Sequence, residues 1–165
     1  MKSENKPIKR QKDLVPLSRD HHEGLLLCWK IRTGLKNEIE RERIRNYVVY
    51  FFDHDLKEHF RQEEQLVFAL LNEDEVMRKE AFDQHKVLYG MVEELRMQKT
   101  SVEELLAQFA DKLDDHIRFE ERKLFPYIET HADPQRLQEA GVQIAALHQQ
   151  NAKVVWDDEF WLKTR

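Results

Sequence analysis

The chain has 165 residues, of which 36% are charged and 41% hydrophobic, and it contains only 4 glycines and 4 prolines. This length can bury the core of one domain, and the scarcity of helix-breaking residues favours an all-α fold. The formal net charge is −5, with acidic and basic residues interspersed, which argues against a nucleic-acid-binding or membrane-binding surface. A single cysteine excludes an internal disulfide and a cysteine-based metal cluster within one chain.

No run of residues approaches the roughly 18 apolar positions of a membrane span, and the basic start of the chain leads into no signal-peptide core. We therefore expect a soluble, cytoplasmic protein that binds neither membranes nor nucleic acid. Residues 1–13 are polar and basic, and we expect them to form a flexible N-terminal arm.

The first helix is expected after this arm, with Ser18 as its N-cap following a proline. Its apolar stripe contains His21, at helical spacing from Leu17 and Cys28. His22 is followed by leucines three and four residues further on, so it could also face inward. The stripe favours His21 as an inward residue, and it leaves open that His22, or both, take that role.

Two long helices are predicted next, over about residues 40–71 and 72–98. The first carries His59 and Glu63 on the same side as its apolar residues. The second starts at an acidic cap and has His85 in its apolar stripe. Each helix therefore directs at least one histidine toward the core.

A capping-box pattern at Ser101 begins a fourth helix, which should continue to about residue 130 with a bend at Pro126. Its inward side includes His116 and Glu120. Burying a histidine on each of four helices would be costly unless the imidazoles found hydrogen bonds or a metal.

An Asp-Pro step at residues 133–134 predicts the start of a fifth helix, which should reach about residue 153. The aromatic segment 154–161 is expected to dock on the other helices. Four helices of similar length joined by short turns predict an up-down-up-down four-helix bundle with an additional C-terminal helix. We accordingly expect the bundle over residues 14–132, and the C-terminal helix with its docking tail over residues 133–165.

The main functional signal is a repeat of ten residues, at 59–68 and 116–125. In each copy a histidine precedes a glutamate by four residues, which places both side chains on one helix face, about 40° apart. One such pair is weak evidence, because this spacing is a routine surface interaction. Two copies, accompanied by histidines on two other helices, favour metal ligation over solvated or mutually hydrogen-bonded pairs.

Together these motifs resemble the hemerythrin-like, or HHE cation-binding, family. The resemblance covers about residues 14–131 and rests on the run 17–22, the segments 59–64 and 116–126, and the stretch around His85. It implies a core that holds a non-haem di-iron centre with bridging carboxylates. The ligands that it implies are His21 or His22, His59, His85 and His116 as terminal ligands, with Glu63 and Glu120 as bridges.

The chain departs from the oxygen-carrying hemerythrins at two places. Those proteins have two histidines four residues apart on the third helix, whereas Ala81 and Tyr89 flank His85 here. Their last bridging carboxylate is an aspartate one residue later than Glu120. These departures weigh against reversible oxygen carriage and leave iron binding as the expectation.

Imidazole and carboxylate groups suit iron, manganese and zinc. Six candidate ligands exceed what one tetrahedral zinc ion needs, which favours two metal ions with open positions. We expect two iron ions, with manganese or zinc as alternatives. Dioxygen, peroxide or nitric oxide would be the corresponding small ligand.

Several other residues have weaker claims on the site. Glu64 and Glu121 lie about 140° from the repeat histidines, which predicts solvated or supporting roles. His54 is expected on the surface and His131 at a helix end. His148 shares an apolar stripe and is a candidate additional ligand.

Three functional classes follow. The leading one is a metal-binding protein that binds or senses oxygen, peroxide, nitric oxide or iron. The second is a di-iron oxidase or peroxidase, but no histidine has the glutamate three residues earlier that ferritin-like oxidases carry. The third is a metal-free helical interaction module, which is distinguished from the others by the absence of stoichiometric metal in the purified protein. We expect a metal-binding protein rather than an enzyme.

Overall fold

The computed structural model describes residues 9–97, 101–150 and 155–162, and the regular secondary structure of these residues is helical, with no strand. The first helix, α1, spans Val15–Lys36. The second helix of the bundle combines α2 (Arg41–Phe51), a π-helical turn (Phe52–Leu56), α3 (Lys57–Gln62), a second π-helical turn (Glu63–Val67) and a short 3₁₀ turn (Phe68–Leu70). The remaining helices are α4 (Val76–Met97), α5 (Val102–Phe119) with a π-helical turn (Glu120–Leu124) leading into α6 (Phe125–His131), and α7 (Pro134–Gln150).

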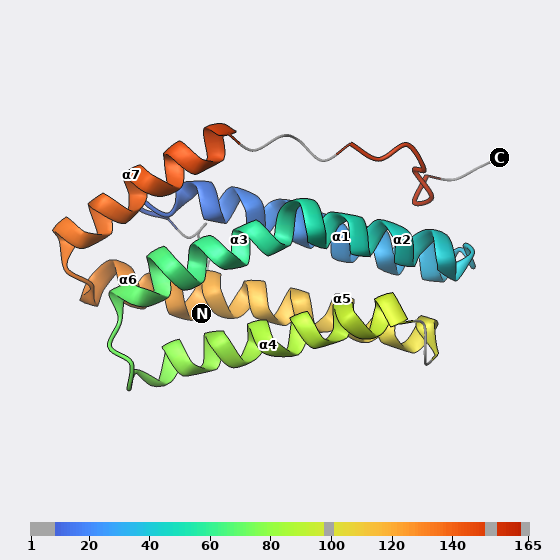
Figure 1. Cartoon of the computed structure of the whole chain (residues 1–165), viewed down its shortest axis with the longest axis horizontal. Coiled ribbons are helices and arrows are strands. Elements are labelled where there is room, and N and C mark those ends of the chain that lie inside the picture. Colours follow the sequence, from blue (N-terminus) through green and yellow to red (C-terminus); the bar gives the residue numbers. More distant parts are fainter. Residues whose placement is uncertain (1–8, 98–100, 151–154, 163–165) are drawn as a thin grey trace, which may run out of the picture.

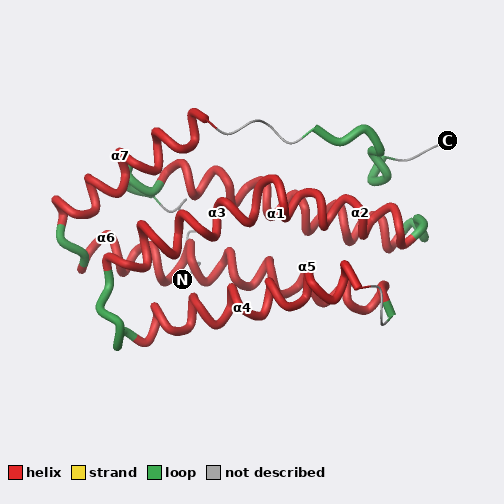
Figure 2. The backbone as a smooth tube through the Cα atoms, in the orientation of Figure 1, coloured by secondary structure: helices red, strands yellow, loops and turns green. Residues whose placement is uncertain are grey.

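The helices form an up-down-up-down bundle with α7 outside it (Figure 1). Around the bundle, α1 packs on α2, α2 on α4, α4 on α5, and α5 on α1. Short loops join α1 to α2, the second helix of the bundle to α4, and α6 to α7 (Figure 2). The helix α7 packs against α1 and the π-helical turn Glu63–Val67. The predicted all-α fold, a four-helix bundle with an additional C-terminal helix, is therefore confirmed.

The predicted start of the first helix is wrong. It begins at Val15, with Leu14 as the N-cap residue, and the Ser18 amide already donates a helical hydrogen bond to the Leu14 carbonyl. Pro16 lies in the first turn, where a missing backbone N–H costs nothing. Ser101 does occupy the N-cap of α5, although its side chain makes no capping hydrogen bond.

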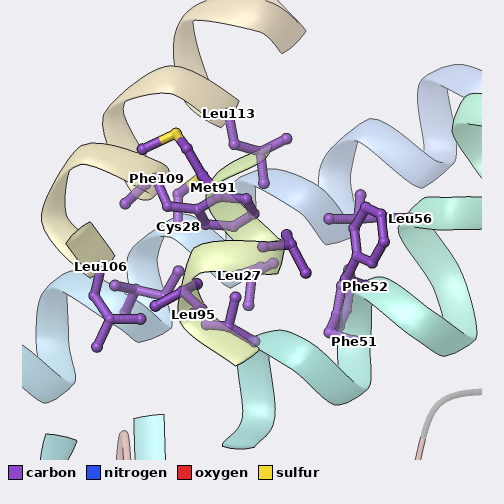
Figure 3. Packing of buried hydrophobic residues seen from close by; sticks show 14 of the residues in the cluster. Leu27, Cys28, Phe51, Phe52, Leu56, Met91, Leu95, Leu106, Phe109 and Leu113 are labelled. Atoms are coloured by element: carbon purple, nitrogen blue, oxygen red, sulfur yellow. The ribbon is translucent and has the colours of Figure 1, made fainter. Parts of the chain in front are cut away.

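Buried apolar side chains form two clusters. The larger one joins side chains from α1, α2, α4 and α5, including Leu27, Phe51, Leu95 and Phe109 (Figure 3). The smaller one lies toward the other end of the bundle and includes Leu17, Phe68, Ala81, Phe125 and Ile144.

A layer of buried polar residues separates the clusters along every helix of the bundle. On α1, for example, His21 lies between Leu17 of the smaller cluster and Leu27 of the larger one. On α4, His85 lies between Ala81 and Leu88 in the same way. The polar layer is therefore built into a dry interior.

The described part of the aromatic tail packs on the end of the bundle away from α7. Phe160 is buried and meets Tyr47 edge to face. It also lies against Gly34, where an added Cβ atom would be 2.9 Å from the Phe160 ring. Arg43 pairs with Asp158 and helps to hold the tail. Residues 1–8 of the predicted arm, and the last predicted turn of the fifth helix up to residue 153, lie outside the described residues.

In the parts of the chain that the structure describes, no helix combines the length and apolar character needed to cross a membrane.

Candidate metal centre

Four imidazoles and two carboxylates meet in the polar layer. None of them is more than 4% exposed. They come from all four helices of the bundle, and the two repeats contribute a histidine and a glutamate each. The six residues are His21, His59, Glu63, His85, His116 and Glu120.

Regular helix geometry aligns each repeat pair. The Glu63 amide bonds to the His59 carbonyl, and the Glu120 amide bonds to the His116 carbonyl, so each pair keeps α-helical spacing. Both glutamates are also the first residue of a π-helical turn. Such turns widen the helix and often occur at functional sites. The residue after each glutamate contacts a histidine on a neighbouring helix.

The six side chains divide into two groups of four. His21 and His59 belong to one group, His85 and His116 belong to the other, and both groups include Glu63 and Glu120. Within each group the ligand atoms all lie within 4.8 Å of one another. The two carboxylates are thus shared.

The inner imidazole nitrogens lie close to carboxylate oxygens and, in one pair, close to each other. Nε2 of His21 is 3.0 Å from a Glu120 oxygen and 3.6 Å from a Glu63 oxygen. Nε2 of His85 is 3.2 Å from a Glu63 oxygen and only 3.1 Å from Nε2 of His116. Each group of four therefore has the size of a site for one small cation, and not for a larger cofactor.

The outer nitrogen, Nδ1, of each histidine faces an oxygen acceptor on the preceding helix around the bundle. Each acceptor is adjacent in the sequence to one of the six residues, on the same helix as that residue. This arrangement closes a ring of second contacts around the six residues. The pairs are Asp20 with His59 (2.9 Å), Glu64 with His85 (3.2 Å), Gln84 with His116 (2.7 Å) and Glu121 with His21 (2.6 Å).

These outer contacts determine which nitrogen is free inside. When Nδ1 donates its hydrogen to an oxygen, Nε2 of a neutral imidazole carries a lone pair. The Nε2 lone pairs of His85 and His116 would then face each other at 3.1 Å. Facing lone pairs are unfavourable unless a proton or a cation lies between them. An imidazole with its outer N–H bonded and its inner nitrogen free has the orientation that metal-binding histidines adopt.

Without a metal, the carboxylates draw protons into the layer. Burial alone lowers the pKa of an imidazole, but Glu63 and Asp20 outweigh this effect and raise the pKa of His59 to about 10. Glu63 and Glu64 likewise raise the pKa of His85 to about 9. The layer therefore attracts positive charge, whether from protons or from metal ions.

Several inner atoms have no hydrogen-bond partner among the described residues: His59 Nε2, Glu63 Oε2 and Glu120 Oε2. A buried polar atom without a partner costs about 1–3 kcal/mol, and more when it is charged. Two anionic carboxylates in a dry interior are a larger cost still. Cations bound by these atoms would offset both the cost of the unpaired atoms and the cost of the buried charges. The residues therefore fit a metal site.

The tandem histidines are separated by the helix geometry. His21 is buried in the layer, whereas His22 is exposed and belongs to neither group. Successive helical residues differ by about 100° in direction, so only one of the two can follow the stripe. His54 and His131 are also exposed, and each bonds to the carbonyl four residues earlier.

Sequence reasoning predicted some of the supporting residues and missed others. Glu64 and Glu121 were expected to be solvated or supporting, and they lie on outer nitrogens. Asp20 and Gln84 were not singled out, although each directly precedes a ligand candidate in the sequence. His148, the candidate additional ligand, is in neither group and bonds to Asp20 instead, at 2.7 Å.

A four-helix bundle with six candidate nitrogen and oxygen ligands between two apolar clusters has the architecture of bundles that build a metal site in the core. The particular family follows from a comparison of the sequence with family models. The model of the hemerythrin HHE cation-binding domain matches residues 13–128, so the chain belongs to this family. No curated protein and no solved structure matched the chain in the corresponding comparisons.

Proposed function

We propose that this chain holds a non-haem di-iron centre and uses it to bind or sense dioxygen, peroxide, nitric oxide or iron. The observation that carries the proposal is the sharing of Glu63 and Glu120 by two groups of four ligands. A carboxylate has two oxygens and can span two ions, which the neutral imidazoles cannot do. Two ions with four protein ligands each would both keep open positions.

The protein supplies orientation and a dry environment. Phe60 stacks on the His85 ring at 4.1 Å, and Phe125 stacks on the His21 ring at 5.4 Å between ring centres. These rings exclude water from the inner atoms and limit rotation of the imidazoles. A bound iron pair would add redox chemistry and Lewis acidity toward a small ligand.

A route for such a ligand lies between α4 and α5. A surface cavity of about 540 Å³ is lined by residues that include Val87, Gln84 and His116. His116 itself is only 1% exposed, and Gln84 occupies its outer nitrogen. We propose that small molecules approach the centre from this side, past the Gln84 side chain.

The test is elemental analysis of the full chain purified without oxygen, together with its optical spectrum. We expect two iron ions per chain. Separate additions of dioxygen, peroxide and nitric oxide then identify the ligand by the spectral change that each produces. Glu63→Gln serves as the matched variant, and it should lose the metal and the spectral response. A single zinc ion per chain, or no stoichiometric metal, contradicts the di-iron proposal.

A further inference from the structure

Two residues outside the matched domain contact residues that surround the polar layer. The family match covers residues 13–128, whereas Arg10 precedes it and His148 on α7 follows it. Arg10 contacts Glu121, the acceptor for His21, and His148 contacts Asp20, the acceptor for His59. His21 and His59 belong to the same ligand group.

Arg10 holds Glu121. Its side chain is only 6% exposed, and Nη2 donates to the Glu121 carboxylate at 2.8 Å and to the Glu121 carbonyl at 2.6 Å. Its other terminal nitrogen pairs with Glu129, and the guanidinium lies over the Phe125 ring. Glu121 in turn accepts the hydrogen bond from His21. Arg10 therefore fixes the acceptor that orients His21.

His148 holds Asp20 in a similar way. Its Nε2 lies 2.7 Å from the same Asp20 oxygen that accepts from His59, at 2.9 Å. The other nitrogen of His148 donates to the Ile144 carbonyl at 2.9 Å. With an acceptor at both nitrogens, both nitrogens donate. His148 therefore fixes the acceptor that orients His59.

Close packing keeps α7 in position for this contact. Gly141 of α7 lies so near the start of the bundle that an added Cβ atom would be 2.9 Å from the Asp13 Cα atom. Leu137 and Ile144 on the same helix are buried in the smaller apolar cluster. Figure 1 shows α7 beside α1, which carries Asp20, and α7 also packs on the π-helical turn Glu63–Val67 that follows His59 on α3.

The other ligand group is supported from within the matched domain. Glu64, the acceptor for His85, receives a hydrogen bond from the Tyr89 hydroxyl at 2.8 Å. The acceptor for His116 is Gln84. Both Tyr89 and Gln84 belong to α4. The flanking segments thus contact the supports of one group and not, among the described residues, those of the other.

We infer that Arg10 and His148 are positioning residues for His21 and His59, so that the segments flanking the domain set the affinity of one of the two metal positions. This inference rests on the proposed di-metal function. Losing an outer partner of a metal-binding histidine typically weakens metal binding by about 10–100-fold. Arg10 and His148 act one contact further out, so we expect about a tenfold effect, confined to one position.

Anaerobic titration of the metal-free full chain with ferrous ion tests the inference. In Arg10→Gln and in His148→Gln we expect one ion bound as in the unmodified chain and the other about tenfold more weakly. The controls are Arg43→Gln, which breaks an arginine–carboxylate pair on the tail, and His131→Gln, which removes a histidine with the same bond to its own helix. Both controls should bind two ions normally. Normal affinity in the two test variants, or equal weakening at both positions, overturns the inference.

A second measurement needs no metal. In ¹⁵N NMR spectra of the imidazoles, His148→Gln should shift the Nδ1 signal of His59 and leave that of His85 in place. Gly141→Ala, which pushes α7 away from Asp13, should reproduce the shift without altering His148. An unchanged His59 signal in both variants overturns the positioning role. An unmodified chain that takes up no metal overturns the proposed function instead, so the two failures can be told apart.

Discussion

Gln84 Oε1 lies 2.7 Å from Nδ1 of His116, so the residue that precedes one candidate ligand, His85, holds a second candidate on the next helix. Three other neighbours of the layer have the same role, and together they link the four helices into a ring. Ligand orientation in this bundle therefore depends on the packing between helices as well as on each helix.

The Gln84 contact can be removed without adding charge. Gln84→Leu should weaken binding of one metal ion by about 10–100-fold, because the His116 imidazole loses the acceptor that fixes its outer nitrogen. Metal titration measures the effect. Gln65→Leu is the control, since Gln65 is exposed on the second helix of the bundle and contacts no histidine of the layer. Equal affinities in both variants would show that the contact has no influence.

Glu63 and Glu120 are predicted to be essential to both metal positions. Replacing either with glutamine keeps its size and removes the charge that both ligand groups share. We expect loss of both ions, with helix content by circular dichroism unchanged and a lower melting temperature, because bound metal stabilises the folded state. Glu64→Gln retains an acceptor for His85 and should keep both ions with at most about tenfold weaker binding. Metal retained in Glu63→Gln but abolished in Glu64→Gln would reverse the assignment.

The tandem histidines should differ sharply. His21→Ala removes a buried imidazole from the layer and should reduce the metal content measured by elemental analysis. His22→Ala changes an exposed side chain outside both groups and should leave two ions per chain. The opposite order of effects would transfer the ligand role to His22.

Metal-free protein should lose stability as the pH rises from about 7 to 10. In the folded chain the pKa of His59 is raised to about 10 and that of His85 to about 9, from a usual value of 6.5. Protonation of these groups therefore stabilises the fold fully below about pH 6.5, and this contribution disappears as the pH passes through the folded-state values.

Thermal melts in the presence of a chelator measure this dependence. The decrease should be smaller in His85→Gln, which removes one of the titrating groups. Metal ions compete with the same protons, so iron uptake should release protons and weaken as the pH falls. A metal-free melting temperature that stays constant or rises over this range contradicts the raised pKa values.

Phe160 offers a test of stability that is separate from the metal. Its ring is 1% exposed and packs against Gly34 and Tyr47. Phe160→Ala should reduce the free energy of unfolding by about 3–5 kcal/mol, as expected for a buried aromatic residue. Denaturant unfolding measures the loss, and the metal content at room temperature should not change. Exposed Leu162 provides the control, since Leu162→Ala should have little effect.

The helices and the local part of the site could be predicted from the sequence alone. Helical periodicity depends on residues close together in the chain, and the spacing of four residues puts His59 and Glu63 on one face wherever the helix lies. The same periodicity favoured His21 but left His22 open, and the burial of His21 and the exposure of His22 in the folded chain separated the two. Capping and proline patterns located the starts of α5 and α7. The start of α1 was displaced because Pro16 is tolerated inside a first turn, and α4 begins at Val76 rather than near residue 72.

The contacts of the outer histidine nitrogens, by contrast, depend on how the helices pack and could not be predicted from the sequence. Asp20 and His59 are 39 residues apart, and Asp20 and His148 are 128 apart. Their contacts depend on the rotation and axial offset of helices that pack against one another, which no local pattern specifies. The π-helical turns that begin at Glu63 and Glu120 are likewise not predicted by a 3.6-residue period. Ligand faces are thus a property of single helices, whereas ligand orientation arises only when the helices pack together.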